Sequence, residues 1–260
     1  MPTYKEIRIS YNGVEVDTLV YQPNSKEMDA LLVYHGTTMD DSKVHVAAET
    51  ILSKVRSIIK RDDLMIVSVA YPEEGLLFGD NIKEAEAALL WVKNSASKAL
   101  KVKVNRTFLL GHSQGGYLVT RLNTMHKTDG VVANGSGPID LSFRCKLDER
   151  NKVEPRNGAS QKKGTVCSLL KDEYGSVFDD PDPYKARSLI NFYSGHKSKI
   201  LFVQGLKDKK IQMTLWPKFK EKINQCTDCT DYTFLELEDS GHGAIFENKE
   251  AIEAVNEFLR

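Results

Sequence analysis

The stretch "LLGHSQGGYLV", residues 109–119, sets the interpretation of the whole chain. An apolar run leads in from Phe108, and apolar residues at helical spacing follow. Between them Ser113 lies in the pattern Gly-x-Ser-x-Gly, which is typical of a sharp turn from strand to helix. Such a turn lifts the serine hydroxyl above a sheet edge, at a helix N-terminus. Ser113 is therefore a candidate nucleophile; a plain tight turn between glycines is the alternative.

The rest of the chain alternates strands with helices. Residues 4–23 alternate polar and apolar side chains around Asn12-Gly13, which predicts an antiparallel hairpin. Buried strands are predicted at residues 29–36 and 64–72, and further strands at 106–111, 130–137, 199–205 and 230–238. Apolar residues three and four apart predict helices at 42–60, 81–96, 116–125 and 251–260. This alternation predicts an α/β fold with a mostly parallel sheet flanked by helices.

One long polar segment interrupts the alternation between two predicted strands. Residues 138–197 are rich in charge and carry two cysteines. We interpret this segment as an inserted lid or cap, helical near Leu169 and over residues 184–192. The core would then consist of residues 1–137 and 198–260.

A serine nucleophile needs a histidine base and a carboxylate that orients it. Of the six histidines, His242 lies in a glycine loop between the last strand and the last helix, at the same sheet edge as Ser113. Asp208 follows the strand "ILFVQG" at that edge, and the order serine, aspartate, histidine is the one expected of this topology. Asp140 is the alternative acid, and Asp239 is read as a brace of the histidine loop.

The tetrahedral intermediate of acyl transfer also needs hydrogen-bond donors for its oxyanion. The backbone N–H of Gln114 is one candidate. Thr37, in "HGTT" after the strand at 29–36, is the second, and Thr38 is a weaker choice. An ordinary turn after the strand is the alternative for this loop.

Large apolar side chains near the predicted edge are candidates for substrate contacts, although such residues more often pack in a core. They are Tyr71, Leu76, Leu77, Phe78 and Trp216.

Composition narrows the class of protein. Lys plus Arg and Asp plus Glu both number 36, so the net charge is zero, which argues against a general binder of nucleic acid. No apolar run approaches the roughly 20 residues of a membrane span. The N-terminus lacks the apolar stretch of a signal peptide, so we expect a cytoplasmic protein, or an exported one whose leader was removed.

The cysteines leave three interpretations open. Two local disulfides, free thiols, or a zinc site are each compatible with Cys145, Cys167, Cys226 and Cys229. Zinc is the weakest of these because the first two lie 22 residues apart, without a matching C-x-x-C.

Four segments together resemble the α/β-hydrolase family, and the resemblance spans nearly the whole chain. They are "HGTT", "GHSQGG", "QGLKDKKI" and "SGHGAIF". The sequence looks most like the branch of dienelactone hydrolases, prolyl-oligopeptidase-type catalytic domains and small carboxylesterases, and "SQGG" also resembles acyl-protein thioesterases. It departs from them in having Ser113 where dienelactone hydrolases have cysteine, in "HGTT" instead of "HGGG", and in lacking a propeller within these 260 residues.

The resemblance implies a serine hydrolase that cleaves carboxylic esters through an acyl-enzyme. It implies no metal or organic cofactor and a small-molecule ester as the partner, with no indication of oligomeric state. A peptidase of short peptides, an acyl thioesterase and a catalytically idle binding module are the alternatives.

Overall fold

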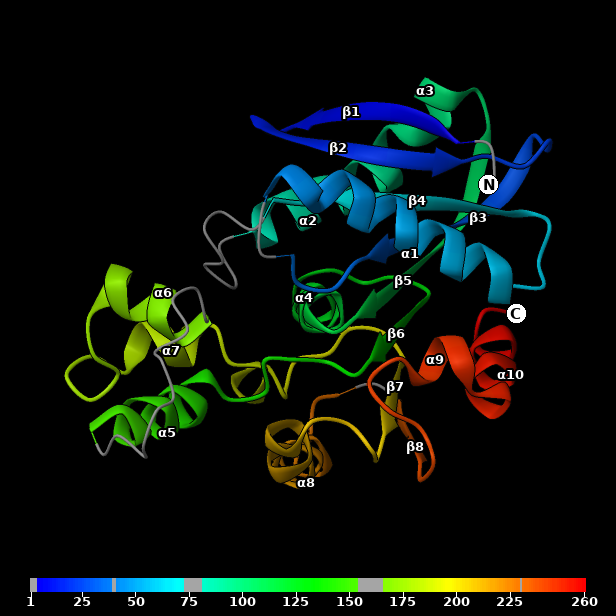
Figure 1. The fold of residues 1–260 in the computed structure, drawn as a ribbon. Helices are drawn as coiled ribbons and strands as arrows, with labels where there is room; N and C mark the ends of the chain where they lie inside the picture. The colour runs from blue at the N-terminus through cyan, green and yellow to red at the C-terminus, as the bar shows by residue number, and fades with distance from the viewer. Residues whose placement is uncertain (1–3, 39–40, 73–80, 154–165, 230) are drawn as a thin grey trace.

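The computed structural model describes residues 4–38, 41–72, 81–153, 166–229 and 231–260, and for residues 151–153 it describes the backbone alone (Figure 1). Among these residues, no helix is both long enough and apolar enough to cross a bilayer.

An eight-stranded sheet runs through the molecule in the order β1-β2-β4-β3-β5-β6-β7-β8. The hairpin of β1 and β2 and the β2–β4 pair are antiparallel, and all other pairs are parallel. This confirms the predicted α/β fold. The strands are β1 (Lys5–Tyr11), β2 (Val14–Tyr21), β3 (Glu27–Tyr34), β4 (Leu64–Ala70), β5 (Lys103–His112), β6 (Gly130–Asn134), β7 (Ile200–Gly205) and β8 (Tyr232–Leu237).

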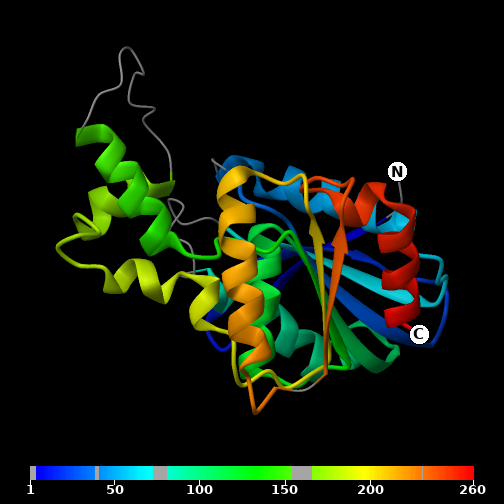
Figure 2. The same ribbon diagram turned by 90° about the horizontal axis from the view of Figure 1, so that it is seen from below.

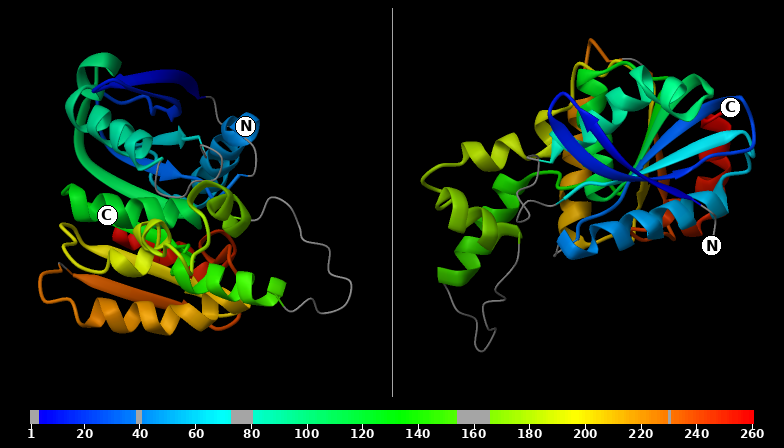
Figure 3. Two further views of the ribbon diagram at one scale, coloured as in Figure 1. Left: turned by 90° about the vertical axis from the view of Figure 1, so that its left-hand side faces the viewer. Right: turned by 90° about the horizontal axis from the view of Figure 1, so that it is seen from above.

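Helices cover both faces of the sheet (Figures 2 and 3). One face packs against α1 (Val44–Ile58), α9 (Ala244–Glu247) and α10 (Lys249–Phe258), with η1 (Asp41–Lys43) ahead of α1. The other face packs against α2 (Ile82–Asn94), α3 (Ala96–Leu100), α4 (Gln114–Met125) and α8 (Lys210–Asn224).

The strand sequences explain this layering. Successive side chains of a strand point to opposite faces, so Leu32 and Tyr34 of β3 join the α2 and α4 side, while Leu31 and Val33 join the α1 side. All seven residues of β4 are buried because both faces are covered.

The insertion between β6 and β7 folds around a small core of its own. It contains α5 (Leu141–Val153), α6 (Val166–Tyr174), α7 (Asp182–Ala186) and the short helix η3 (Leu189–Asn191). A disulfide joins Cys145 of α5 to Cys167 of α6 inside this core, beside buried Leu170 and Tyr184. Figure 2 shows α5, α6 and α7 standing out beyond α8 on one side of the sheet.

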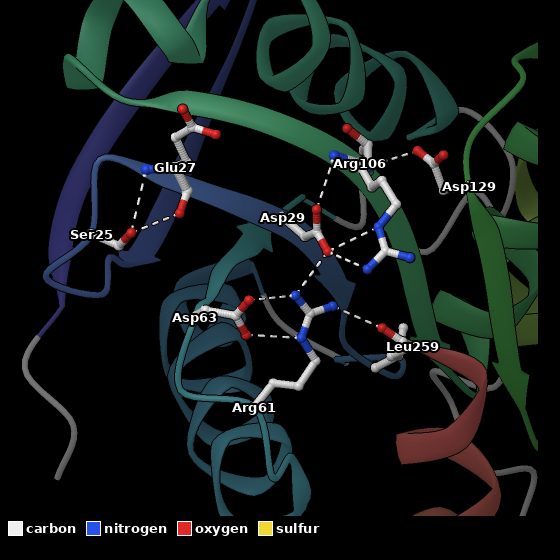
Figure 4. A network of polar contacts seen from close by, with 9 residues as sticks. Ser25, Glu27, Asp29, Arg61, Asp63, Arg106, Asp129 and Leu259 are labelled. Carbon is white, nitrogen blue, oxygen red and sulfur yellow. Dashed lines mark hydrogen bonds and ion pairs between the residues drawn. The ribbon is translucent and has the colours of Figure 1, made fainter.

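A network of ion pairs ties the amino ends of the parallel strands together (Figure 4). Asp29 of β3 is only 5% exposed, and its Oδ2 lies 2.7 Å from Nη2 of Arg106 on β5 and 2.8 Å from Nη2 of Arg61. Arg61 also donates to the carboxylate of Asp63 and to the carbonyl of Leu259 (2.8 Å each) near the end of the chain. Two strands and the C-terminus therefore depend on one buried carboxylate.

Replacing Asp29 by Asn should lower the free energy of unfolding at neutral pH by about 2–4 kcal/mol, because two guanidinium groups lose their carboxylate. Burial would raise the pKa of Asp29, but its bonds to Arg106 and Arg61 outweigh burial and hold that pKa below its ordinary value. The carboxylate therefore stabilises the fold above the unfolded-state pKa, and this stabilisation is lost as pH falls through the folded-state value. Urea unfolding across the acid range measures both effects.

Asp62→Asn is the matched control, since Asp62 pairs with Arg56 but is 94% exposed. Its replacement should change the stability by less than about 1 kcal/mol. If Asp29→Asn were as mild as this control, the network would contribute nothing to the fold.

Candidate active site

The backbone at Ser113 is held in an unusual conformation between β5 and α4. Its φ of 58° and ψ of −116° lie where non-glycine residues are rarely found. The Ser113 N–H donates to the carbonyl of Asn134 (2.9 Å), and its carbonyl accepts from the N–H of Gly137 (3.2 Å). The end of β6 therefore fixes the serine from both sides of its peptide unit.

The flanking glycines are required by close backbone approach. A Cβ on Gly111 would lie 2.0 Å from the carbonyl oxygen of Gly115. A Cβ on Gly115 would lie 2.0 Å from the carbonyl oxygen of Tyr34 at the end of β3. The Gly-x-Ser-x-Gly pattern is thus explained by a strand and a helix that cross at near contact.

Asp208 and His242 form a hydrogen-bonded pair at the same edge of the sheet. Asp208 follows β7, and its Oδ2 lies 2.7 Å from Nδ1 of His242, which follows β8. The Asp208 side chain is fully buried, whereas that of His242 is 30% exposed. Because a carboxylate only accepts, Nδ1 of the imidazole carries the hydrogen, and a neutral ring offers Nε2 as the base.

The turn after β6 brings this pair to the serine. A Cβ on Gly135 would lie 3.1 Å from Nδ1 of His242, and Gly137 bonds the carbonyl of Ser113. The ring of His112, next to Ser113 in the chain, lies 4.9 Å from the ring of His242. Ser113, Asp208 and His242 therefore gather where β5, β7 and β8 end.

Several donors hold Asp208 ionised. Burial would raise the pKa of this carboxyl group, but hydrogen bonds from Nδ1 of His242, the N–H of Lys209 and Nε2 of Gln204 outweigh burial and lower it. The aspartate can therefore balance a positive charge that develops on the imidazole.

The sequence did not single out the amides that orient these groups. Gln212 donates from Nε2 to Oε1 of Gln204 (3.1 Å) and to the carbonyl of Ser136 (2.9 Å). Gln204 in turn donates to Asp208 (3.1 Å), which links the acid to the turn that holds the serine. The signal available in the sequence was an amide ending an otherwise apolar strand, at Gln204 and again at Asn134.

The loop after β3 lies against Ser113. A Cβ on Gly36 would lie 3.3 Å from Cβ of Ser113, and Thr37 follows it. Gln114 opens α4, where the first N–H groups have no acceptor within the helix. The two N–H groups predicted as oxyanion donors thus belong to segments that flank Ser113.

Two of the residues predicted to contact substrate, Tyr71 and Trp216, are buried in the protein interior. Tyr71 is fully buried; its ring stacks on that of His35 (centroids 4.1 Å apart) and its hydroxyl donates to the His35 carbonyl. Trp216 is 1% exposed in the core, and its Nε1 donates to Glu236 (2.6 Å). Their burial argues against the predicted contact with substrate, and gives Tyr71 the task of holding the 35–37 loop. Leu76, Leu77 and Phe78 lie outside the described residues.

The alternative acids have other partners. Asp140 accepts from the N–H of Phe143 (2.9 Å) at the start of α5, and Asp239 pairs with Lys207 (2.7 Å) at the surface. Of these three carboxylates, Asp208 is the one bonded to a histidine.

Both cysteine pairs are disulfides. Cys145 is bonded to Cys167, and Cys226 to Cys229 after the end of α8. With each sulfur bonded to its partner, the alternatives of free thiols and of a four-cysteine zinc site are not what the structure contains.

Gly115→Ala should prevent folding or cost more than about 4 kcal/mol of stability, because the added methyl would meet backbone that no side-chain rotation can move. Gly241→Ala is the control, since a Cβ there has no heavy atom within 4 Å. It should change the stability by less than about 1 kcal/mol. Thermal melts of both variants test this, and a well-folded Gly115→Ala protein would contradict the crossing described here.

No protein-family model matches the sequence, and neither does any curated protein. Solved structures do match. Est1E from Butyrivibrio proteoclasticus has a TM-score of 0.66 at 14% identity, over 98% of this chain and 97% of its own. The Pyrococcus furiosus esterase Pf2001 has a TM-score of 0.67 at 17% identity, over 99% of this chain and 90% of its own.

A longer protein matches as well. The Pyrococcus horikoshii acylaminoacyl peptidase has a TM-score of 0.67 at 11% identity over 99% of this chain, which spans 41% of that peptidase. The sheet order and these likenesses agree, and the chain has the α/β-hydrolase fold.

Proposed function

We propose that this protein is a serine hydrolase that cleaves carboxylic esters through an acyl-enzyme. The observation that carries the proposal is the buried Asp208 bonded to His242 beside a serine in a strained turn. These are the three groups, in the three environments, that activation of a serine hydroxyl requires.

In this proposal Ser113 Oγ attacks the ester carbonyl while Nε2 of His242 takes its proton. Asp208 stabilises the imidazolium and keeps Nδ1 protonated. The N–H groups of Thr37 and Gln114 bind the oxyanion of the tetrahedral intermediate. His242 then gives its proton to the leaving alcohol. In the second half of the reaction, water attacks the acyl-enzyme with His242 as its base, and the carboxylic acid is released from Ser113. Each step uses groups of this chain, so the proposal calls for no metal or organic cofactor.

Two of the solved structures with this fold are named as esterases, which favours a small-molecule ester as the substrate. A peptidase is the second candidate, because the acylaminoacyl peptidase shares the fold at a similar TM-score. A set of aminoacyl-anilides assayed beside the esters separates the two, since faster cleavage of the anilides would favour the peptidase.

The inserted helices are proposed as a lid that bears on the acyl group. They follow β6, whose end contacts Ser113, and they carry a core stabilised by the disulfide between Cys145 and Cys167. Phe192 near the end of the insertion packs edge-on against Tyr117 of α4 (centroids 6.1 Å apart). The insertion is thus anchored to the helix that Ser113 begins.

The triad is tested as a unit. Ser113→Ala should lower kcat for ester hydrolysis by roughly 10³ or more, and should abolish labelling by a fluorophosphonate. Asp208→Asn should lower kcat by roughly 10²–10⁴, because an amide favours the wrong tautomer of the imidazole.

Asp140→Asn is the matched control, since an asparagine still accepts the hydrogen bond that begins α5. Its kcat should stay within about twofold of the parent, because the residue has no part in the proposed chemistry. A large loss of kcat in Asp140→Asn, with little loss in Asp208→Asn, would show that the acid follows β6 and that the assignment of Asp208 is wrong.

The lid is tested through its disulfide. Replacing Cys145 and Cys167 together by Ser should loosen the small core, since a cross-link of 22 residues is worth about 3 kcal/mol. We expect an altered preference for acyl chain length with unchanged labelling of Ser113 by a small organophosphate. An unchanged chain-length profile in the folded variant would make the insertion a decoration of the surface.

A further inference from the structure

A cavity of about 200 Å³ lies beside the candidate site, between the 35–37 loop and α1. The loop contributes Gly36 and Thr37, and the turn before the nucleophile contributes His112. The remaining walls include Thr50, Ile51 and Lys54 of α1 and Phe246 of α9. Of these lining residues, the mechanism proposed above uses Thr37 alone.

The cavity adjoins the imidazole of His242 through a shared neighbour, His112. Phe246 follows His242 by four residues, and the ring of His112 packs against both, at 5.4 Å from Phe246 and 4.9 Å from His242. In ester cleavage the histidine protonates the departing oxygen. An alcohol that extends from that oxygen past His112 would reach the cavity.

Among the residues that line the cavity, Lys54 is the one with a permanent charge. The ammonium of Lys54 stands 5.3 Å from the centre of the Phe246 ring, and no carboxylate of the described residues lies within ion-pair distance of it. Burial and the nearby His242 and Lys54 lower the pKa of His112 to about 3. Burial lowers the pKa of His35 to about 4. Both rings are neutral near pH 7, so Lys54 supplies the formal charge.

The neutral His112 adds a donor. Nδ2 of Asn134 donates to Nδ1 of His112 (2.7 Å), so this ring carries its hydrogen on Nε2. An ammonium, an imidazole N–H and the hydroxyl of Thr50 are donors that suit an anion, while Ile51 and Phe246 suit a short hydrocarbon arm.

We propose that this cavity binds a carboxylate carried on the leaving alcohol of the ester substrate, with Lys54 as its cationic partner. The single charge of the ammonium balances that of one carboxylate. At about 30 Å³ for each water molecule, the volume is that of roughly six waters, which suits a small ligand such as a short hydroxy acid. The inference rests on the proposed ester hydrolysis and names the class of substrate for that site.

The test compares acetates of glycolic, hydroxypropionic and hydroxybutyric acids with acetates of the corresponding hydroxyamides. The acyl group is the same in every compound, and each pair differs in a carboxylate against a neutral amide of similar size. We expect kcat/KM to favour the acid for at least one chain length. Because Lys54 is exposed, its replacement by Met should lower this preference by about two- to fivefold, as for an exposed ion pair, while hydrolysis of the amides is unchanged.

Lys60→Met is the control, because it removes an exposed positive charge just beyond the end of α1. It should keep the acid preference of the parent protein. Equal preference in Lys54→Met and the parent, or equal loss in both variants, would overturn the carboxylate subsite.

A second readout does not need turnover. Hydroxybutyrate should slow fluorophosphonate labelling of Ser113 more than hydroxybutyramide does, and Lys54→Met should remove the difference. Equal slowing by the two compounds in the parent would also overturn the subsite. If Ser113 is labelled but no ester is cleaved, the proposed function fails while this comparison still decides the fate of the subsite.

Discussion

The end of β6 is the constraint on which the site depends. The carbonyl of Asn134 accepts a hydrogen bond from the N–H of Ser113, and the N–H of Gly137 donates to the carbonyl of Ser113. The positive φ of the serine is therefore held by hydrogen bonds from outside β5 and α4. The same turn lies against His242 and accepts a bond from Gln212. A single bend of main chain therefore contacts Ser113, His242 and the amide side chain of Gln212, which is bonded through Gln204 to Asp208.

Around that bend, three buried or half-buried amide side chains have hydrogen-bond partners. Gln204 and Gln212 connect Asp208 to the turn through side-chain bonds, and Asn134 connects His112 to the His242 carbonyl. Amides suit this place because each offers donors and an acceptor without a charge. A charged side chain there would compete with Asp208 for the imidazole and would bear the full cost of burial.

Local patterns predicted the hairpin, the buried strands and the amphipathic helices of the core, because each has its own periodicity. They gave no assignment for α8, whose apolar spacing at Ile211, Leu215, Phe219 and Ile223 is interrupted by Pro217. Glycine spacing and chain order identified Ser113, Asp208 and His242 as candidates; the structure bonds Asp208 to His242, and the catalytic roles of all three are the proposal made above. The Gln204 and Gln212 relay and the burial of Tyr71 and Trp216 depend on packing between distant segments, which periodicity does not encode.

The disulfide between α5 and α6 makes the stability of the insertion depend on the redox state of its surroundings. Disulfides persist in oxidising compartments and are reduced in most cytosols. A chain made in a reducing host would leave Cys145 and Cys167 as thiols within the small core that Leu170 and Tyr184 complete. The sheet and the Ser113 turn lie outside the small core that this disulfide joins. Oxidised and reduced protein would therefore share one fold and differ in the stability of the inserted helices.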